Sequence, residues 1–256
     1  MVPLSVVIIT LNEEKNIGRC IDSVKEIADD IVVVDSFSTD KTKEICIAKA
    51  IRFVEQDFLG YIEQKNFANT QAKYPHILSL DADEALSPEL IQSIKNIKSN
   101  WKADGYTMYR LTNYCGKWIY HCGWYPDTKL RLWDSRKGKW TGINPHDRFE
   151  MRKDAAIFHL NGNLLHYSYY TFDDHLQQVQ KFSTVAAKAM HEKGIKSSIC
   201  KILFKPLARF IKIYIVKQGF RDGYYGYLIA RVSSFAVFLK YVKLFSLQKG
   251  TKSSRL

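Results

Sequence analysis

Three carboxylates follow a short apolar run in the segment Ile77–Glu84, which reads ILSLDADE. The apolar residues predict a buried strand. Because side chains along a strand alternate with a period of two, this strand end is expected to place Asp81 and Asp83 on the same side of the chain. Two close carboxylates need a cation, and Mg²⁺ or Mn²⁺ held by them takes phosphate oxygens as further ligands. The spacing therefore suits a nucleotide diphosphate site, and an acidic loop that caps the next helix is the alternative.

The segments before this motif predict the repeat of an α/β fold. Leu4–Thr10 and Asp30–Val34 are almost continuously apolar and β-branched, which is typical of strands covered on both faces in a parallel sheet. Between them, apolar residues recur at three- and four-residue spacing and predict one helical stripe, made of Ile17, Cys20, Ile21, Val24 and Ile27. We expect Asn12 to cap this helix, with Glu13 in its first turn, because both residue types are favoured there.

The following segments continue the repeat. Arg52–Val54 predicts a short strand, Tyr61–Ala72 predicts a helix, and Ser87-Pro88 predicts the start of the helix after the acidic motif. Ligands of open α/β sheets bind outside the carboxyl ends of the strands. The polar residues that fall at those ends are Thr10, Asn12, Glu13, Asp35 and Asp81. Their shared location predicts one binding site.

In this order, the motifs resemble the nucleotide-sugar-binding half of family 2 glycosyltransferases. The residues that carry the resemblance are Leu4–Glu14, Val32–Ser36 with Ser38–Asp40, Gln64–Asn66 and Leu80–Glu84. The resemblance covers roughly residues 1–180, and within the family the chain is most similar to the bacterial lipopolysaccharide core glucosyltransferase group. It implies an α/β fold of GT-A type, which is a Rossmann-like, doubly wound sheet.

The resemblance also implies an activity and the roles of several residues. The expected reaction is an inverting transfer of a sugar, with glucose as the expected sugar, from a UDP-sugar to a lipid-linked saccharide such as lipopolysaccharide core, with Mg²⁺ or Mn²⁺ as cofactor. Asp35 is expected to hold the nucleobase, Asp81 the ribose and Asp83 the metal. The residues expected to bind the nucleotide sugar are Thr10, Asn12, Glu13, Asp35, Lys65, Asp81 and Ala82.

An inverting transfer also needs a carboxylate that removes the proton of the acceptor hydroxyl, so this general base belongs on the acceptor side of the domain. Gly142–Glu150 is expected to be a polar loop there, and by resemblance Asp147 matches the position of the family's acidic residue. Glu150 is the second candidate, because members close to this group more often have Glu where Asp147 stands. The alternative is that both carboxylates only pair with Arg148 or Arg152.

Two further candidates lie in the acceptor half. His166 follows a short predicted strand and resembles the late histidine that completes the metal site in some related transferases, although a histidine at a strand end is also commonly just hydrogen-bonded. Trp124 and Tyr125 are candidates for stacking on the acceptor sugar, and packing in the core is the alternative.

Charge divides the chain. Residues 1–180 hold 22 Lys and Arg against 24 Asp and Glu, a net charge of −2, whereas residues 181–256 hold 16 against 2, a net charge of +14. We expect a catalytic domain over residues 1–195, composed of a nucleotide-sugar-binding half (1–100) and an acceptor half (101–195), followed by a basic amphipathic helical tail over residues 196–256.

Apolar residues broken by single cations predict that this tail lies on an anionic membrane surface. Helices packed on the catalytic domain are the alternative, and nucleic acid is not an expected partner, because no nucleic-acid motif accompanies the charge. The chain starts directly in a predicted strand without the features of a signal peptide, and its five cysteines suit a reducing compartment. We therefore expect a peripheral protein on the cytoplasmic face of the plasma membrane.

Two other functions fit parts of the pattern. A sugar-phosphate nucleotidyltransferase also uses a doubly wound sheet and paired carboxylates, but it needs a glycine-rich basic loop after the first strand. The turn at Thr10–Glu14 has no glycine and two acids instead. A non-enzymatic membrane-binding module with a degenerate acidic motif is the second alternative.

Overall fold

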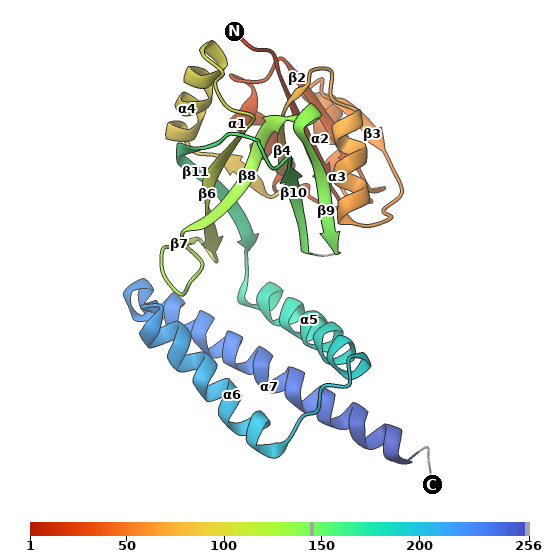
Figure 1. The fold of residues 1–256 in the computed structure, drawn as a ribbon, viewed down its shortest axis with the longest axis vertical. Helices are drawn as coiled ribbons and strands as arrows, with labels where there is room; N and C mark the ends of the chain where they lie inside the picture. Colours follow the sequence, from red (N-terminus) through yellow and green to blue (C-terminus); the bar gives the residue numbers. More distant parts are fainter. Residues whose placement is uncertain (144–145, 254–256) are drawn as a thin grey trace. The chain divides into compact units, whose positions relative to one another are not determined.

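The computed structural model describes residues 1–143 and 146–253, which form two compact units (Figure 1). The first unit comprises residues 1–111 and 127–167, and the second comprises residues 112–126 and the chain from residue 168. The boundary expected after residue 195 falls inside the second unit, and the division into a catalytic domain and a tail stays a prediction.

A mixed β-sheet in the order β3-β2-β1-β4-β8-β6-β11-β5 forms the centre of the first unit. Its parallel strands are β1 (Leu4–Thr10), β2 (Asp30–Asp35), β3 (Arg52–Glu55) and β4 (His76–Asp81). The others are β5 (Glu84–Leu86), β6 (Gly105–Tyr114), β8 (Asp127–Asp134) and β11 (Ile157–Tyr169). Because β8 runs antiparallel to both β4 and β6, the Rossmann-like parallel half gives way to an antiparallel half at this strand.

Helices cover both faces of the parallel half, as a doubly wound sheet requires. Val6 and Ile8 belong to a core shared with the first, second and fourth helices, whereas Val7 and Ile9 belong to a core shared with the third. These helices are α1 (Ile17–Val24), α2 (Thr42–Ala48), α3 (Tyr61–Thr70) and α4 (Pro88–Ser99). All residues of the predicted α1 stripe are buried, and full burial of each large aliphatic side chain stabilises the fold by about 1.5–3 kcal/mol.

Helix α1 begins later than the sequence suggests, so the prediction that Asn12 caps it was wrong. Asn12 has a left-handed backbone (φ 54°), which asparagine tolerates, and Asn16 occupies the N-cap position. The Asn12 amide N–H donates to Ser38 Oγ at 2.7 Å, and its side-chain Oδ1 accepts from the Thr39 amide at 2.8 Å. Asn12 therefore joins the loops that follow β1 and β2.

A β-hairpin replaces the polar loop predicted at Gly142–Glu150, so this prediction was wrong. After the short 3-10 helix η1 (Ser135–Lys137), β9 (Gly138–Ile143) pairs antiparallel with β10 (His146–Met151). The cross-strand neighbours Trp140 and Phe149 are buried, and the Phe149 ring stacks on Trp133 of β8 at 3.8 Å between centroids. This aromatic packing supplies the burial that holds the hairpin.

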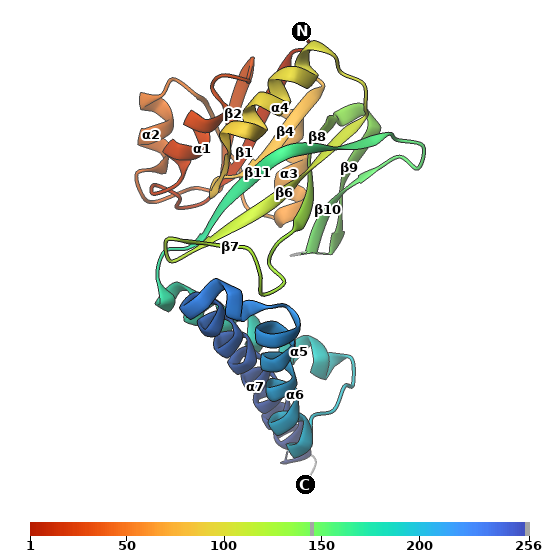
Figure 2. The same cartoon turned by 90° about the vertical axis from the view of Figure 1, so that its left-hand side faces the viewer.

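The second unit is helical and contains α5 (Phe172–Glu192), α6 (Ile199–Ile211), the π-helical turn η2 (Lys212–Val216), the 3-10 helix η3 (Gly219–Asp222) and α7 (Gly223–Ser253). Both α5 and α6 pack along α7, as Figure 2 shows. The short strand β7 (Lys117–Ile119) pairs with the last residues of β6 in this unit.

Over residues 1–143 and 146–253, no helix combines the length and the apolar character needed to cross a membrane.

Candidate functional site

The ends of β1 and β2 are held side by side. Thr10 and Asp35 are neighbours in the parallel register, and both are buried. The Asp35 carboxylate accepts from the Ser38 amide at 2.7 Å and from the Ser38 hydroxyl. The Thr10 hydroxyl is buried without a hydrogen-bond partner among the described residues, which is uncommon for a polar group inside a protein.

Glu13 lies in acidic surroundings. Burial raises the pKa of Glu13 to about 7, and the carboxylates of Asp83, Asp40 and Asp81 add to this shift, while a hydrogen bond from Asn16 opposes it. A bound cation or protonation relieves the repulsion that neighbouring carboxylates exert on such a carboxyl group. This strand end is therefore suited to bind a positively charged group.

Asp81 is tied to the antiparallel half of the sheet. Its Oδ2 accepts from Arg131 Nη2 at 2.6 Å, and Lys65 Nζ lies 3.2 Å from Oδ1. The same Arg131 nitrogen donates to Glu84 Oε1 at 2.7 Å, and both Arg131 and Glu84 are buried. Desolvation raises the pKa of Asp81, but the positive charges of Arg131 and Lys65 outweigh it and hold the pKa far below its usual range.

The sequence does not single out Arg131, although a signal is present. Arg131 stands between Leu130 and Leu132 in an apolar stretch of the sequence, and a charge at such a position needs a partner when the stretch is buried. The sequence does not say that the partners are Asp81 and Glu84, because they are 50 and 47 residues away.

Asp83 and His166 form a second pair at this end of the sheet. His166 Nε2 lies 3.1 Å from Asp83 Oδ2, and both side chains are partly exposed. Strand β4 ends at Asp81, so the reasoning from strand alternation does not extend to Asp83. Between them, the Ala82 amide donates to the carbonyl of Ile9 at 3.1 Å, which holds the acidic turn against β1.

The donor set of this pair fits a divalent cation. A carboxylate and an imidazole are ligands that Mn²⁺ accepts, and Mg²⁺ also binds through one or two carboxylates and substrate phosphates. Within the described part of the chain, no group of three or more His, Cys, Asp or Glu side chains is placed to hold a metal. A cation bound by Asp83 and His166 would complete its coordination with water or substrate oxygens.

The two candidates for the general base lie on β10. Glu150 is exposed, its Oε2 accepts from the Thr141 hydroxyl at 2.9 Å, and Arg148 Nη2 lies 3.9 Å away. The alternative that Glu150 only pairs with a neighbouring arginine therefore holds in part. The side chain of Asp147 lies outside the described residues, and the choice between the two stays a prediction.

Trp124 and Tyr125 belong to the second unit. The Trp124 ring contacts Tyr114 edge-on and also lies against Tyr169 and His175, while Tyr125 contacts Tyr120. These contacts agree with the alternative that Trp124 packs in the protein core. A role for either residue in stacking on a sugar stays a prediction.

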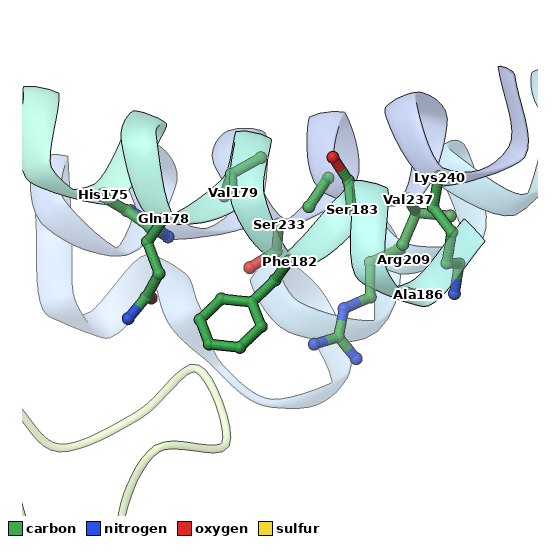
Figure 3. A pocket seen from close by; sticks show the side chains of 11 residues that line it. His175, Gln178, Val179, Phe182, Ser183, Ala186, Arg209, Ser233, Val237 and Lys240 are labelled. Carbon is green, nitrogen blue, oxygen red and sulfur yellow. The ribbon is translucent and has the colours of Figure 1, made fainter. Parts of the chain in front are cut away.

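The second unit contains a cavity of about 420 Å³ between α5, α6 and α7 (Figure 3). Phe182 of α5, Arg209 of α6 and Lys240 of α7 are among the residues that line it. Burial lowers the pKa of His175, at one end of the cavity, to about 4, and its Nδ1 is 2.9 Å from the Tyr114 hydroxyl. The cavity contains none of the residues predicted for the site.

Comparison with known proteins gives a consistent family. Residues 5–156 match the family described as glycosyl transferase family 2. An uncharacterised glycosyltransferase of Rickettsia bellii is 34% identical over 94% of this chain and 85% of its own length. A lipopolysaccharide core biosynthesis glycosyltransferase of Rhizobium meliloti, LpsC, is 29% identical over 95% of this chain and 92% of its own.

Among solved structures, glucosyl-3-phosphoglycerate synthase from Mycobacterium tuberculosis, bound to Mn²⁺, UDP and glucosyl-3-phosphoglycerate, aligns with a TM-score of 0.37 and 22% identity, over 43% of this chain and 44% of that one. TarS of S. aureus aligns with a TM-score of 0.43 and 14% identity, over 72% and 39%.

Proposed function

The chain belongs to glycosyl transferase family 2, and from this premise we propose that it is an inverting hexosyltransferase that uses a UDP-sugar, with glucose as the expected sugar. The observation that carries the proposal is the pair Asp83 and His166, 3.1 Å apart beside the joined loops of β1 and β2. The relative named for lipopolysaccharide core biosynthesis supports a lipid-linked saccharide as acceptor.

The nucleoside is assigned to the ends of β1 and β2. Asp35 is fixed by Ser38, and each carboxylate oxygen retains a lone pair for an N–H of the uracil. The unpartnered Thr10 hydroxyl and the loop held by Asn12 lie at the same edge. In this structure the Asp81 carboxylate already contacts Lys65 and Arg131. A hydrogen bond from a ribose hydroxyl would therefore use a carboxylate lone pair that these two cations leave available.

Asp83 and His166 would hold a Mg²⁺ or Mn²⁺ ion, which when bound supplies positive charge to the departing diphosphate. The acidic surroundings of Glu13 support a cation at this place.

The acceptor side supplies the proton acceptor. As the acceptor oxygen bonds to the anomeric carbon and the bond to UDP breaks, a carboxylate takes the hydroxyl proton. We assign this role to Asp147, with Glu150 as the alternative. In either case the charge on the base is neutralised while the negative charge moves to UDP.

The second unit supports an anionic membrane surface as a partner. Apolar side chains at every fourth position of α6 and η2 are exposed, namely Ile199 (65%), Leu203 (60%), Leu207 (55%), Ile211 (46%) and Ile215 (55%). Lys205, Arg209 and Lys212 are exposed on the same segment. An exposed apolar stripe bordered by cations is typical of helices that lie in a membrane interface. We therefore propose a peripheral location on the cytoplasmic face of the membrane.

Donor turnover separates the proposed function from its rivals. UDP-glucose, UDP-galactose and UDP-N-acetylglucosamine are incubated with the protein, with and without Mn²⁺, and UDP release is measured. A transferase releases UDP slowly by hydrolysis, and addition of acceptor accelerates the release. A nucleotidyltransferase instead forms pyrophosphate from UTP and a sugar phosphate, and a membrane-binding module turns over none of these substrates.

Sedimentation with lipid vesicles tests the membrane proposal. The wild-type protein should sediment with vesicles that contain phosphatidylglycerol, and salt should release only part of it, because exposed charges are screened over about 8 Å at physiological ionic strength whereas apolar insertion is not. Leu207→Ser should weaken this binding, and Ile47→Ser, which changes an exposed apolar residue of α2 in the first unit, should not. Equal binding by wild type and Leu207→Ser would contradict the assignment to α6.

A further inference from the structure

The first unit contains a cavity of about 460 Å³ beside Asp81, within the range of volumes typical of small-ligand sites. Among the described residues that line it, five are cations, namely Lys65, Arg110, Lys129, Arg131 and Arg148. Trp140 and Phe149 of the hairpin form its apolar wall.

The cavity lies on the side of Asp81 toward the antiparallel half of the sheet, the half that we expect to bind the acceptor. Strand β8 pairs with β4 only from His76 with Asp134 to Leu78 with Leu132, so its first residues extend past the pairing. Those residues, together with β6, the hairpin and Lys65 of α3, form the described walls. The loops that hold Asn12 and Asp35 contribute no described residue to it.

Among the described side chains, the cations outnumber their carboxylate partners. Arg131 is shared by Asp81 and Glu84, and Lys65 also pairs with Asp81. Asp127 pairs with both Arg110, at 2.8 Å, and Lys129, at 3.1 Å. Arg148 lies 3.9 Å from Glu150. When this contact is included, the five cations share four carboxylates, so at least one positive charge is in excess.

Two buried donors in the wall also lack acceptors. The Nε of Arg131 and the Nε1 of Trp140 are buried and have no hydrogen-bond partner among the described residues. A buried N–H without an acceptor is uncommon in proteins, and it points to a group that the protein itself does not supply. An oxyanion fits both the surplus charge and the unmet donors, and guanidinium groups match its geometry.

We propose that this cavity binds an oxyanion, phosphate or carboxylate, carried by the acceptor, so that the acceptor is an acidic saccharide. The inference rests on the proposed function and names the chemistry of its second substrate. The bound anion would hold the acceptor in place while the adjacent hydroxyl faces the donor. Neutral acceptors would bind more weakly, because they leave the surplus cations without a counter-charge.

Calorimetry with inorganic phosphate tests the proposal on the full chain. Phosphate should bind to the free protein and, with similar affinity, to the protein saturated with UDP and Mg²⁺. Competition between phosphate and UDP would assign the cavity to the donor diphosphate and overturn the proposal. Absence of phosphate binding would overturn it as well.

Matched variants locate the phosphate. Arg148→Gln removes a cation whose side chain is 73% exposed, so the fold should persist, and it should weaken phosphate binding about tenfold, the scale of a charge-assisted hydrogen bond, with UDP affinity unchanged. Lys43→Gln removes an exposed cation on α2 and should leave phosphate binding unchanged. Equal effects of the two variants would refute the assignment. Failure of UDP to bind would contradict the proposed function alone, because the phosphate titration is independent of it.

Discussion

Replacing Arg131 with glutamine would leave two carboxylates without the guanidinium that neutralises them. Glu84 is 1% exposed and receives its shortest contact from Arg131, at 2.7 Å. After the substitution it retains the Asp81 amide, which donates at 3.1 Å, and a distant Arg110 nitrogen at 3.7 Å. Asp81 retains Lys65.

Removing one partner of a buried ion pair costs about 3–5 kcal/mol. Because both carboxylates retain a second contact, we expect Arg131→Gln to lower the free energy of unfolding of the first unit by about 3 kcal/mol, at the lower end of that range. With a urea dependence of about 2 kcal/mol per molar, the midpoint should fall by about 1.5 M. Urea titration followed by circular dichroism measures it.

The loss should depend on pH. In the wild type, the pKa of Asp81 is held low, so its contribution to stability is present above its unfolded pKa, near 3.9, and is lost as pH falls. The difference in stability between the wild type and Arg131→Gln should therefore be largest above about pH 5 and should shrink as the pH falls below about 4.

Two variants calibrate the result. Arg131→Lys keeps the charge but not the fork geometry and should recover part of the loss. Lys43→Gln breaks an exposed ion pair with Glu55 and should change stability by less than about 1 kcal/mol. A loss in Arg131→Gln as small as that of Lys43→Gln, or a loss independent of pH, would refute this account of the network.

Three further outcomes are expected. Asp83→Ala should abolish metal-dependent UDP binding with the fold intact, since the residue lies in a turn and is partly exposed, and calorimetry with Mn²⁺ would detect retained binding. Asp147→Asn should lower turnover about 10²–10⁴-fold with donor affinity unchanged, and the same signature in Glu150→Gln alone would reverse the assignment. Burial lowers the pKa of His175 to about 4, so the folded second unit favours the neutral imidazole. Acidification from pH 6.5 to 4 should therefore remove at most about 3 kcal/mol of stability. In thermal melts, His175→Gln should lose this pH dependence.

The parallel half of the sheet was predictable because its strands are covered on both faces. Leu4–Thr10 is buried at every position, so its sequence is almost continuously apolar and its limits were predicted to the residue. The hairpin was not predicted, because Trp140 and Phe149 face the core while their neighbours are polar and read as a loop.

In the candidate site, too, individual residues were predictable, whereas contacts between segments far apart in the sequence were not. Asp83 and His166 were expected to share a metal, and the structure places them 3.1 Å apart, although their role stays a prediction. The cations around Asp81 were not expected beyond Lys65. Strand β8 brings Arg131 to Asp81 from 50 residues away, and periodicity within a segment carries no information about such a contact.

Because β8 reaches from the antiparallel half to the acidic motif, the two halves of the catalytic sheet are not interchangeable parts. A chimera that joins residues 1–100 of this chain to the acceptor half of another family member contains Asp81 and Glu84. These carboxylates have a counter-charge only if the other protein has a cation at the position equivalent to Arg131. Recombination between relatives should therefore succeed or fail according to this position. Reprogramming of acceptor choice is best attempted by substitutions within β8 and the hairpin that leave Arg131 intact.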